Sequence, residues 1–162
     1  MNRLEWFVAH TRPRREKKLA RYCEQEGIRV TLPCYRATHK YVRKVVAFEK
    51  PLFPGYVFLQ LQEGEKQKIF QRDDVANLLV VHDQEHFARQ LTEILTALES
   101  KVEVFLAPLI GVGTKVRVKY GPLRGLEGQV EERYGMTTVL LRLDFIGQAA
   151  AVKLAADELE LI

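Results

Sequence analysis

Two histidines, His82 and His86, are four residues apart and could share one face of a helix. Imidazole nitrogens are common zinc ligands, but a zinc site takes three or four protein ligands. No third ligand follows at a suitable spacing, because Asp83 and Glu85 would lie on other faces of the helix. We therefore expect solvated side chains at the start of a helix and no metal site.

The other groupings of reactive residues do not form a catalytic arrangement either. Residues 111–115 are rich in glycine, but they lack the spacing of a phosphate-binding loop and precede a predicted strand. Asp73 and Asp74 are adjacent, so they point apart and are predicted to be loop or helix-capping residues. Cys23 and Cys34 are expected to pack in the protein. The sequence predicts no catalytic residues, no cofactor and no enzymatic activity.

Positive charge is concentrated at the start of the chain. The first 50 residues contain 13 Lys and Arg against 5 Asp and Glu, and the remainder contains 12 against 16. Such a basic end is typical of proteins that contact phosphates, although a solvated charged helix is the alternative. The positions at the predicted helix start oppose the helix dipole, which favours an anionic partner. The cluster comprises Arg12, Arg14, Arg15, Lys17 and Lys18.

An aromatic strand lies between two prolines and Leu61. Strict alternation would place Phe53 with Val57 and Leu59 on one face, and Tyr56 and Phe58 on the other. If only one face packs on helices, the other exposes aromatic rings, as protein-binding surfaces do. A small sandwich that buries both faces is the alternative, which the residues alone favour.

Hydrophobic periodicity organises the first hundred residues. Strands are predicted over 4–9, 28–35, 41–48, 56–61 and 75–81, and helices over 13–26, 66–71 and 84–100. We expect Thr11 to cap the first helix, Pro13 to occupy its first turn and Gly27 to end it. Basic residues at 36–40 (Arg36, His39, Lys40) are expected at an exposed hairpin tip.

The last fifty residues show only short strands separated by turns such as Gly121-Pro122. Strands are predicted over 114–119, 126–132, 137–143, 148–154 and 158–161. Five short strands fit a small β-barrel. The predicted fold class is α+β with a mainly antiparallel sheet. The predicted domains are residues 1–101 and 112–162, joined by a linker at 102–111.

The sequence also indicates the cellular compartment expected for the protein. No apolar stretch approaches the roughly 20 residues of a membrane helix, so no membrane association is expected. The first residues lack the apolar run of a secretion signal. The two isolated cysteines suit a reducing compartment, which predicts a cytoplasmic protein.

Several of these segments together resemble a known family. Residues 6–8, 10–13 and 52–58 (Leu-Phe-Pro-Gly-Tyr-Val-Phe) resemble the amino-terminal NGN domain, an α/β sandwich, of NusG-type transcription elongation factors. Val116–Val130 resembles the KOW motif that begins their carboxy-terminal, SH3-like, five-stranded barrel. The resemblance covers nearly the whole chain and is closest to specialised paralogs, the RfaH-like antiterminators of surface-polysaccharide operons.

The resemblance implies a set of binding sites. Docking on the β′ clamp helices of RNA polymerase is implied for Trp6, His10, Phe53, Pro54, Tyr56 and Phe58. A further contact with the β-subunit gate loop corresponds to residues 67–69. Contact with non-template DNA is implied for Arg12, Arg14, Arg15 and Lys18. Recruitment of ribosomal protein S10 or termination factor Rho through the KOW domain is implied for Phe145, Ile146 and Gly147.

The implied mechanism has no bond-making step. A monomer without cofactors bridges the polymerase cleft and binds the closed, moving conformation better than the paused one. The alternative is a ribosome- or RNA-binding protein that uses the KOW barrel. Residues 52–58 discriminate between the two, because they belong to the polymerase-binding domain and have no role in the ribosomal alternative.

Overall fold

The computed structural model describes residues 3–40, 42–100, 102–108, 113–130 and 138–162. These residues form two compact units, one of residues 1–34 and 53–85, the other of residues 35–52 and 86–162. The units interleave along the chain, whereas the sequence predicts consecutive domains, and the predicted ranges stay a prediction. None of the described helices is long and apolar enough to cross a membrane.

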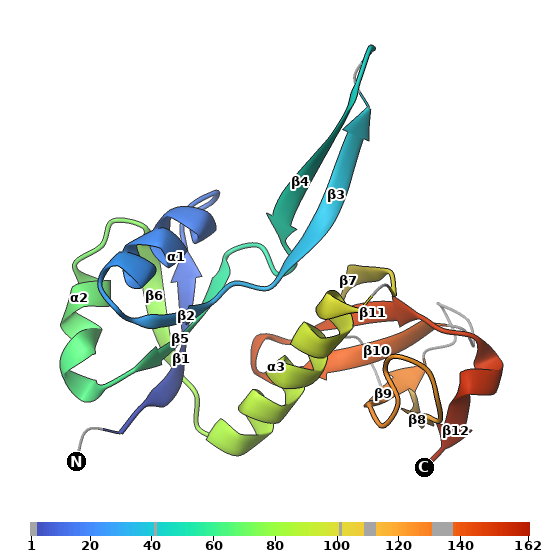
Figure 1. Ribbon diagram of the computed structural model, residues 1–162. Helices are drawn as coiled ribbons and strands as arrows, with labels where there is room; N and C mark the ends of the chain where they lie inside the picture. Colours follow the sequence, from blue (N-terminus) through green and yellow to red (C-terminus); the bar gives the residue numbers. More distant parts are fainter. Residues whose placement is uncertain (1–2, 41, 101, 109–112, 131–137) are drawn as a thin grey trace. The chain divides into compact units, whose positions relative to one another are not determined.

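The first unit contains a four-stranded antiparallel sheet in the order β2-β5-β1-β6 (Figure 1). Its elements are β1 (Glu5–Thr11), α1 (Glu16–Gln25), β2 (Arg29–Thr31), β5 (Tyr56–Leu61), α2 (Lys66–Phe70) and β6 (Val75–Val80). A turn of 3-10 helix, Glu63–Glu65, precedes α2. The predicted mixture of helices and antiparallel strands is confirmed for this unit.

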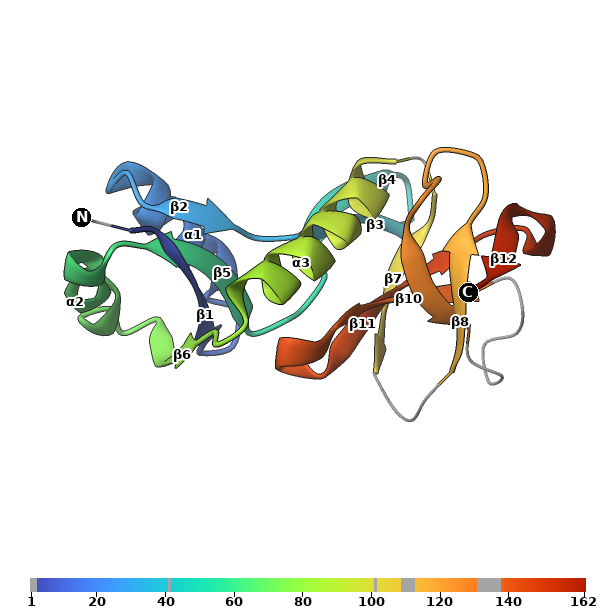
Figure 2. The same cartoon turned by 90° about the horizontal axis from the view of Figure 1, so that it is seen from below.

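One face of this sheet packs against α1 and α2 in a single hydrophobic cluster (Figure 2). Leu19 and Cys23 of α1 are fully buried there, as their helical spacing predicts. Burial raises the pKa of the Cys23 thiol to about 11, so this cysteine is an apolar core residue. Gly27 ends α1 as predicted, with φ of 72° and the N–H of Ile28 bonded to the Cys23 carbonyl at 2.8 Å.

The start of α1 differs from the prediction. The helix begins at Glu16 with Arg15 as its N-cap residue, and no side chain caps it. Thr11 instead ends β1, and Pro13 lies in the turn that follows. The turn takes this path because the N–H groups of Thr11 and Arg12 bond to Gly55 and Asp74, which are distant in the sequence.

A separate two-stranded ribbon is formed by β3 (Cys34–Lys40) and β4 (Val45–Pro51). The predicted strand over 28–35 is in fact two strands, β2 and β3, because Pro33 interrupts the ladder. Residues 36–40 were expected at the hairpin tip but lie within β3, and the described residues 42–44 precede β4.

The predicted amphipathic helix is α3 (Gln84–Glu99), with Phe87, Leu91, Ile94 and Ala97 buried. In the second unit, the C-terminal residues form a six-stranded sheet in the order β12-β8-β9-β10-β11-β7. Its strands are β7 (Val104–Pro108), β8 (Thr114–Val118), β9 (Glu127–Val130), β10 (Thr138–Leu143), β11 (Gln148–Lys153) and β12 (Leu159–Leu161).

All five strands predicted in the C-terminal region are present, and the Gly121-Pro122 turn is confirmed. β7 was not predicted: it lies in the range expected to be a linker and pairs with β11. No pairing joins the two ends of this sheet in the described part of the chain, so the closed barrel is not confirmed and stays a prediction.

Candidate functional site

The aromatic residues predicted to bind a partner come together where β1 and β5 pair. The antiparallel register places Trp6 opposite Gln60, Val8 opposite Phe58 and His10 opposite Tyr56. Side chains directly opposite each other share a face. The His10 and Tyr56 rings stack with centroids 5.1 Å apart and planes 20° apart.

The turn before β5 brings Pro54 beside this stack. Gly55 has φ of 88°, and its carbonyl accepts the Thr11 N–H at 2.8 Å. A Cβ at this position would lie 3.5 Å from Cδ2 of His10, which is an ordinary contact. The positive φ therefore explains the glycine, because L side chains rarely adopt that conformation.

Exposure divides the predicted polymerase-binding residues into two groups. His10 and Pro54 are exposed, and Trp6 and Tyr56 are half-buried. Phe53 and Phe58 are 1% and 0% exposed, so the expectation that their rings are open to a partner is wrong for the free chain. We call the four accessible residues, Trp6, His10, Pro54 and Tyr56, the ring surface.

Phe53 also lies on a different face from the one that alternation predicts. Its ring meets Phe58 edge to face, with centroids 6.2 Å apart, and it does not join the cluster of Val57 and Leu59. Phe53 precedes β5 and belongs to the turn at 52–55, where the two-residue alternation of a strand does not apply. Phe58 is thus a buried residue on the same face of the sheet as Trp6, His10 and Tyr56.

Trp6 is held at the edge of the ring surface by a backbone clasp. Its N–H donates to Oε1 of Gln84 at 2.6 Å, and its carbonyl accepts from Nε2 of Gln84 at 2.9 Å. The side-chain amide of Gln84 therefore makes the two hydrogen bonds to β1 that the backbone of a neighbouring strand would make. Gln84 was not among the predicted site residues, because nothing local to position 84 predicts this contact.

The predicted DNA-binding residues lie on the loop between β1 and α1 and on the first turn of that helix. All four, Arg12, Arg14, Arg15 and Lys18, are exposed. Arg14 has φ of 64°, a left-handed conformation that costs a non-glycine residue roughly 1–2 kcal/mol. Strained residues of this kind are concentrated at functional sites, so the outlier supports a binding role for the loop.

A buried carboxylate determines the shape of this basic loop. Asp74 is 2% exposed, and its Oδ2 accepts hydrogen bonds from Arg72 Nε at 3.1 Å and Nη2 at 2.5 Å. Its Oδ1 lies 3.6 Å from Nη1 of Arg15, and its carbonyl accepts the Arg12 N–H at 2.9 Å. The guanidinium of Arg72 also covers the Tyr22 ring, 4.3 Å from its centroid.

Asp74 was predicted only to be a loop or helix-capping residue. An acidic residue close in sequence to Arg72 could have indicated an ion pair with that arginine. The pairing with Arg15 could not be predicted, because it depends on β6 lying beside β1. Asp74 pairs with both Arg15 and Arg72, while no ion pair involves Arg12, Arg14 or Lys18 in the described part of the chain. Those three charges are therefore available to an anionic partner.

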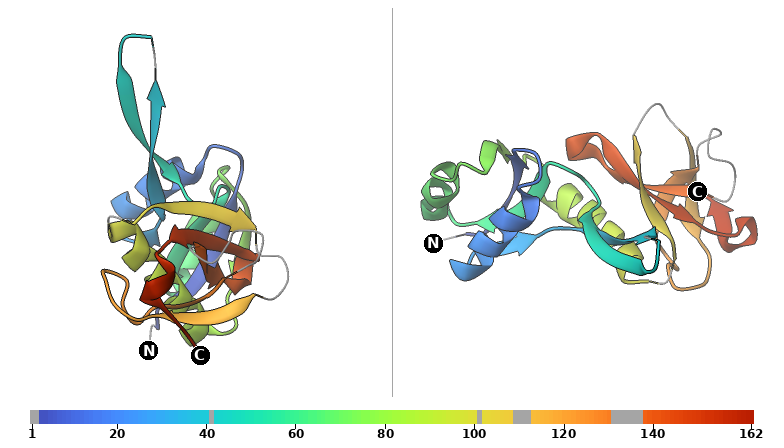
Figure 3. Two further views of the ribbon diagram at one scale, coloured as in Figure 1. Left: turned by 90° about the vertical axis from the view of Figure 1, so that its right-hand side faces the viewer. Right: turned by 90° about the horizontal axis from the view of Figure 1, so that it is seen from above.

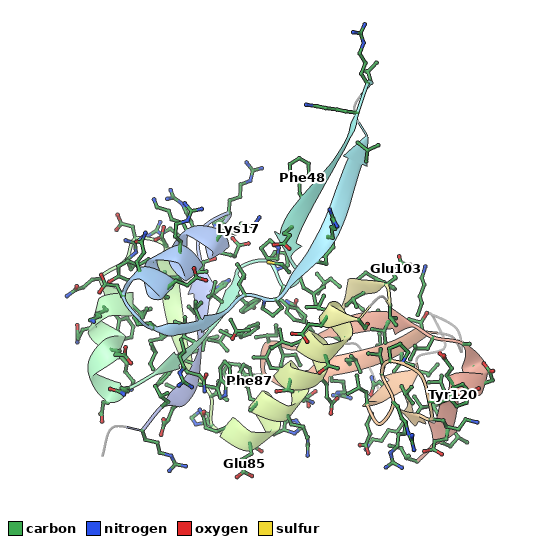
Figure 4. All side chains as sticks on the ribbon, viewed as in Figure 1. Lys17, Phe48, Glu85, Phe87, Glu103 and Tyr120 are labelled. Atoms are coloured by element: carbon green, nitrogen blue, oxygen red, sulfur yellow. The ribbon has the colours of Figure 1, made fainter. Side chains whose placement is uncertain are left out.

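The C-terminal loop predicted to bind a partner is a turn of 3-10 helix, Asp144–Ile146, followed by Gly147 with φ of 65°. Phe145 and Ile146 are half-buried. The Phe145 ring meets Phe87 of α3 edge to face, with centroids 6.0 Å apart; Phe87 is labelled on its helix in Figure 4. The loop is therefore already packed on one side against another part of its own unit.

Asp144 ties this loop to α3. Its carboxylate accepts from His86 Nε2 and Gln90 Nε2, each at 2.9 Å, and from Arg142 Nε at 2.7 Å. Burial raises the pKa of Asp144, but the hydrogen bonds from His86, Arg142 and Gln90 outweigh it and lower the pKa to about 2. His86, expected to be solvated, is thus a structural hydrogen-bond donor.

The other residues considered as metal ligands or phosphate-binding residues do not form a site in the described structure. No group of three potential metal ligands occurs among residues whose placement is described. Thr114 and Lys115 of the glycine-rich segment belong to β8, whereas Gly111 lies outside the described residues. What the geometry offers is two surfaces for macromolecules: aromatic rings beside a basic loop in one unit, and a packed 3-10 turn in the other.

Comparison with known families identifies the family to which this chain belongs. A family model described as "Transcription termination factor nusG" matches residues 4–103. The chain therefore belongs to the NusG family, whose members are transcription elongation and termination factors that bind RNA polymerase. No match was found among curated proteins. The family match includes both the ring surface and the basic loop, and it ends before β7.

Proposed function

We propose that this chain is a specialised, RfaH-like elongation and antitermination factor that docks on the β′ clamp helices of RNA polymerase. The ring surface is the docking site, and the stack of His10 and Tyr56 carries the proposal. Aromatic rings presented on a rigid sheet lose little side-chain entropy on binding, and such residues dominate protein interfaces. Phe53 and Phe58 act as buried supports for this surface in the free chain.

The basic loop then lies against the non-template DNA strand. Arg12, Arg14 and Lys18 supply charges without acidic partners, and Arg15 keeps part of its side chain exposed beside Asp74. Phosphate contacts of this kind position a protein without specifying a base sequence. The factor binds the moving polymerase more tightly than the paused one, and this difference in affinity limits its effect.

The C-terminal residues 112–162 act as a KOW domain that closes into a barrel and recruits a second partner, ribosomal protein S10 or Rho. The turn at residues 145–147 is the recruiting loop. Ile146 and Gly147 offer its accessible part, since the Phe145 ring packs on Phe87. Residues 1–101 form the polymerase-binding domain. The factor works as a cytoplasmic monomer without a cofactor.

A pulldown tests the docking site. Immobilised full chain is incubated with purified core RNA polymerase, and the retained enzyme is compared with that retained by His10→Ala and Tyr56→Ala. Each variant is expected to weaken binding by about tenfold, the equivalent of 1.4 kcal/mol. Tyr120→Ala is the matched control, because Tyr120 is 47% exposed and lies outside the ring surface. Equal retention by His10→Ala, Tyr56→Ala and wild type would refute the proposal.

A further inference from the structure

The β3–β4 ribbon belongs to neither of the two larger sheets of the described structure. Its two strands form a sheet of their own and pair only with each other (Figure 3). Val42, Val45 and Phe48 are 103%, 62% and 41% exposed. An isolated two-stranded hairpin is marginal in water, so burial of its own side chains does not explain this ribbon.

The ribbon also contains a surplus of positive charge. Residues 34–51 include five Lys and Arg but only one acidic residue, Glu49. The described basic side chains, Arg36, Arg43, Lys44 and Lys50, are all exposed. No hydrogen bond or ion pair involves these four in the described structure, whereas Arg15, Arg117 and Arg142 each pair with a carboxylate.

The spacing of these charges suits an extended partner. A strand rises about 3.3 Å per residue, so Lys44 and Lys50 lie roughly 20 Å apart along the ribbon. A single acidic side chain or a compact anion cannot reach charges at both ends. Duplex DNA presents one negative charge per roughly 1.7 Å of its axis, which gives a line of phosphates over that length.

The shape and the apolar residues of the ribbon point to the same partner. The major groove of B-DNA is about 12 Å wide and admits a two-stranded β-ribbon. Alternation along β4 puts Phe48 and Lys50 on one face, so an apolar ring accompanies a cation there. Phe48 projects from the ribbon in Figure 4. Apolar contact with bases beside phosphate contact is common in such complexes.

We propose that the β3–β4 ribbon is a duplex-DNA-binding element, separate from the basic loop at α1. Arg36, Arg43, Lys44 and Lys50 contact phosphates, and Phe48 makes apolar contact within the groove. The proposal goes beyond polymerase docking and does not depend on it. The proposed contacts are with phosphates, which position a protein on DNA without specifying a base sequence.

Fluorescence anisotropy with the purified full chain and a labelled 30-base-pair duplex tests this without polymerase. The variant with alanine at residues 36, 43, 44 and 50 is expected to bind at least about tenfold more weakly. The slope of log affinity against log salt should fall by about 3 to 4, since each lost phosphate contact contributes about 0.9. Phe48→Ala alone should weaken binding a few-fold without changing the salt slope.

The matched control removes the same charge elsewhere. Lys115, Lys119, Arg124 and Lys153 are exposed on the C-terminal sheet and its turns, and their fourfold alanine variant has the same net charge as the ribbon variant. The control should keep most of the affinity. A loss equal to that of the ribbon variant means that net charge alone matters, which overturns the proposal, as does unchanged binding by the ribbon variant.

Two further experiments test whether the ribbon itself binds and whether its partner is duplex DNA. Arg43→Glu combined with Lys44→Glu changes only the connection between the strands, so a loss of binding in this variant cannot come from a broken ladder. Competition with single-stranded DNA, RNA and polyglutamate identifies the kind of partner. Displacement of the duplex by polyglutamate at equal charge concentration, or tighter binding of either single strand, overturns the assignment to duplex DNA.

Discussion

Two aspartates, Asp74 and Asp144, each interact through one carboxylate with at least two side chains, but in different surroundings. The Asp74 side chain is 3% exposed and receives Arg72 and Arg15. The Asp144 side chain is 37% exposed and receives His86 and Arg142. Interactions with a carboxylate therefore have different roles in the two units. In one unit they hold the basic loop from a buried position, and in the other they join a surface turn to α3.

The difference shows what each carboxylate contributes. A buried charge that loses its partner is strongly destabilising, because the remaining charge cannot be fully hydrated. At an exposed site water replaces much of the lost interaction, so the same substitution has a small effect. Asp74 should determine the stability and shape of the basic loop, whereas Asp144 should mainly determine how firmly the 3-10 turn is held.

The largest effect is expected for Asp74→Ala. Removing the carboxylate leaves Arg72 partly buried without its partner and frees the Arg12–Arg15 loop, which should lower the free energy of unfolding by about 3 kcal/mol. Urea denaturation measures this. Asp73→Ala is the control, because Asp73 is the exposed neighbour and should change stability by less than about 0.5 kcal/mol. Equal losses of stability for Asp73→Ala and Asp74→Ala would show that the buried carboxylate of Asp74 has no special role.

Substitutions at Arg14 separate the strain in that loop from its charge. Arg14→Ala and Arg14→Gly remove the same charge, but only glycine adopts the observed φ of 64° without strain. The glycine variant should therefore be more stable than the alanine variant by roughly 1–2 kcal/mol in urea denaturation. Both should lose DNA affinity equally if charge decides binding. An alanine variant as stable as the glycine variant would show that position 14 is unstrained.

A smaller effect is expected for Asp144→Asn. The side chain keeps its shape but loses charge-assisted hydrogen bonds at a site that water reaches, so stability should fall by about 1 kcal/mol. The difference should persist when His86→Ala is the background, because Arg142 and Gln90 still donate. Asp157→Asn, which loses one exposed bond to Tyr120, serves as the control and should change less.

The smallest effect concerns pH. Since the folded-state pKa of Asp144 is lowered to about 2, its contribution is present above its ordinary pKa near 4 and is lost as pH falls toward 2. The gap between wild type and Asp144→Asn should thus be about 1 kcal/mol at pH 7 and near zero at pH 2. Urea denaturation at both pH values measures it. A gap that grows on acidification would contradict the lowered pKa.

Much of the secondary structure could be predicted from local pattern. The apolar spacing at Leu19 and Cys23 predicted the buried face of α1, and Gly27 predicted where that helix ends. The turn at Gly121-Pro122 and its flanking valines predicted β8 and β9. These features depend on residues within a few positions of each other, for which side-chain periodicity and backbone preference are decisive.

The candidate site could be predicted only in part. The residue types of the ring surface were visible in the sequence, but the burial of Phe53 and Phe58 was not. Alternation assigns a face only inside a strand, and Phe53 lies in a turn. β7 escaped prediction because five residues ending in proline show no period strong enough to indicate a strand.

The sequence by itself determined most of the segments that become helices and strands, where the positive charge is concentrated, and that rings cluster near Gly55. Only the tertiary structure decided that Asp74 would hold the basic loop, that Gln84 would clasp Trp6, and that His10 would stack on Tyr56. The physical reason is that these contacts join residues from about 45 to 78 positions apart, and such contacts exist only after the sheet has brought the strands together.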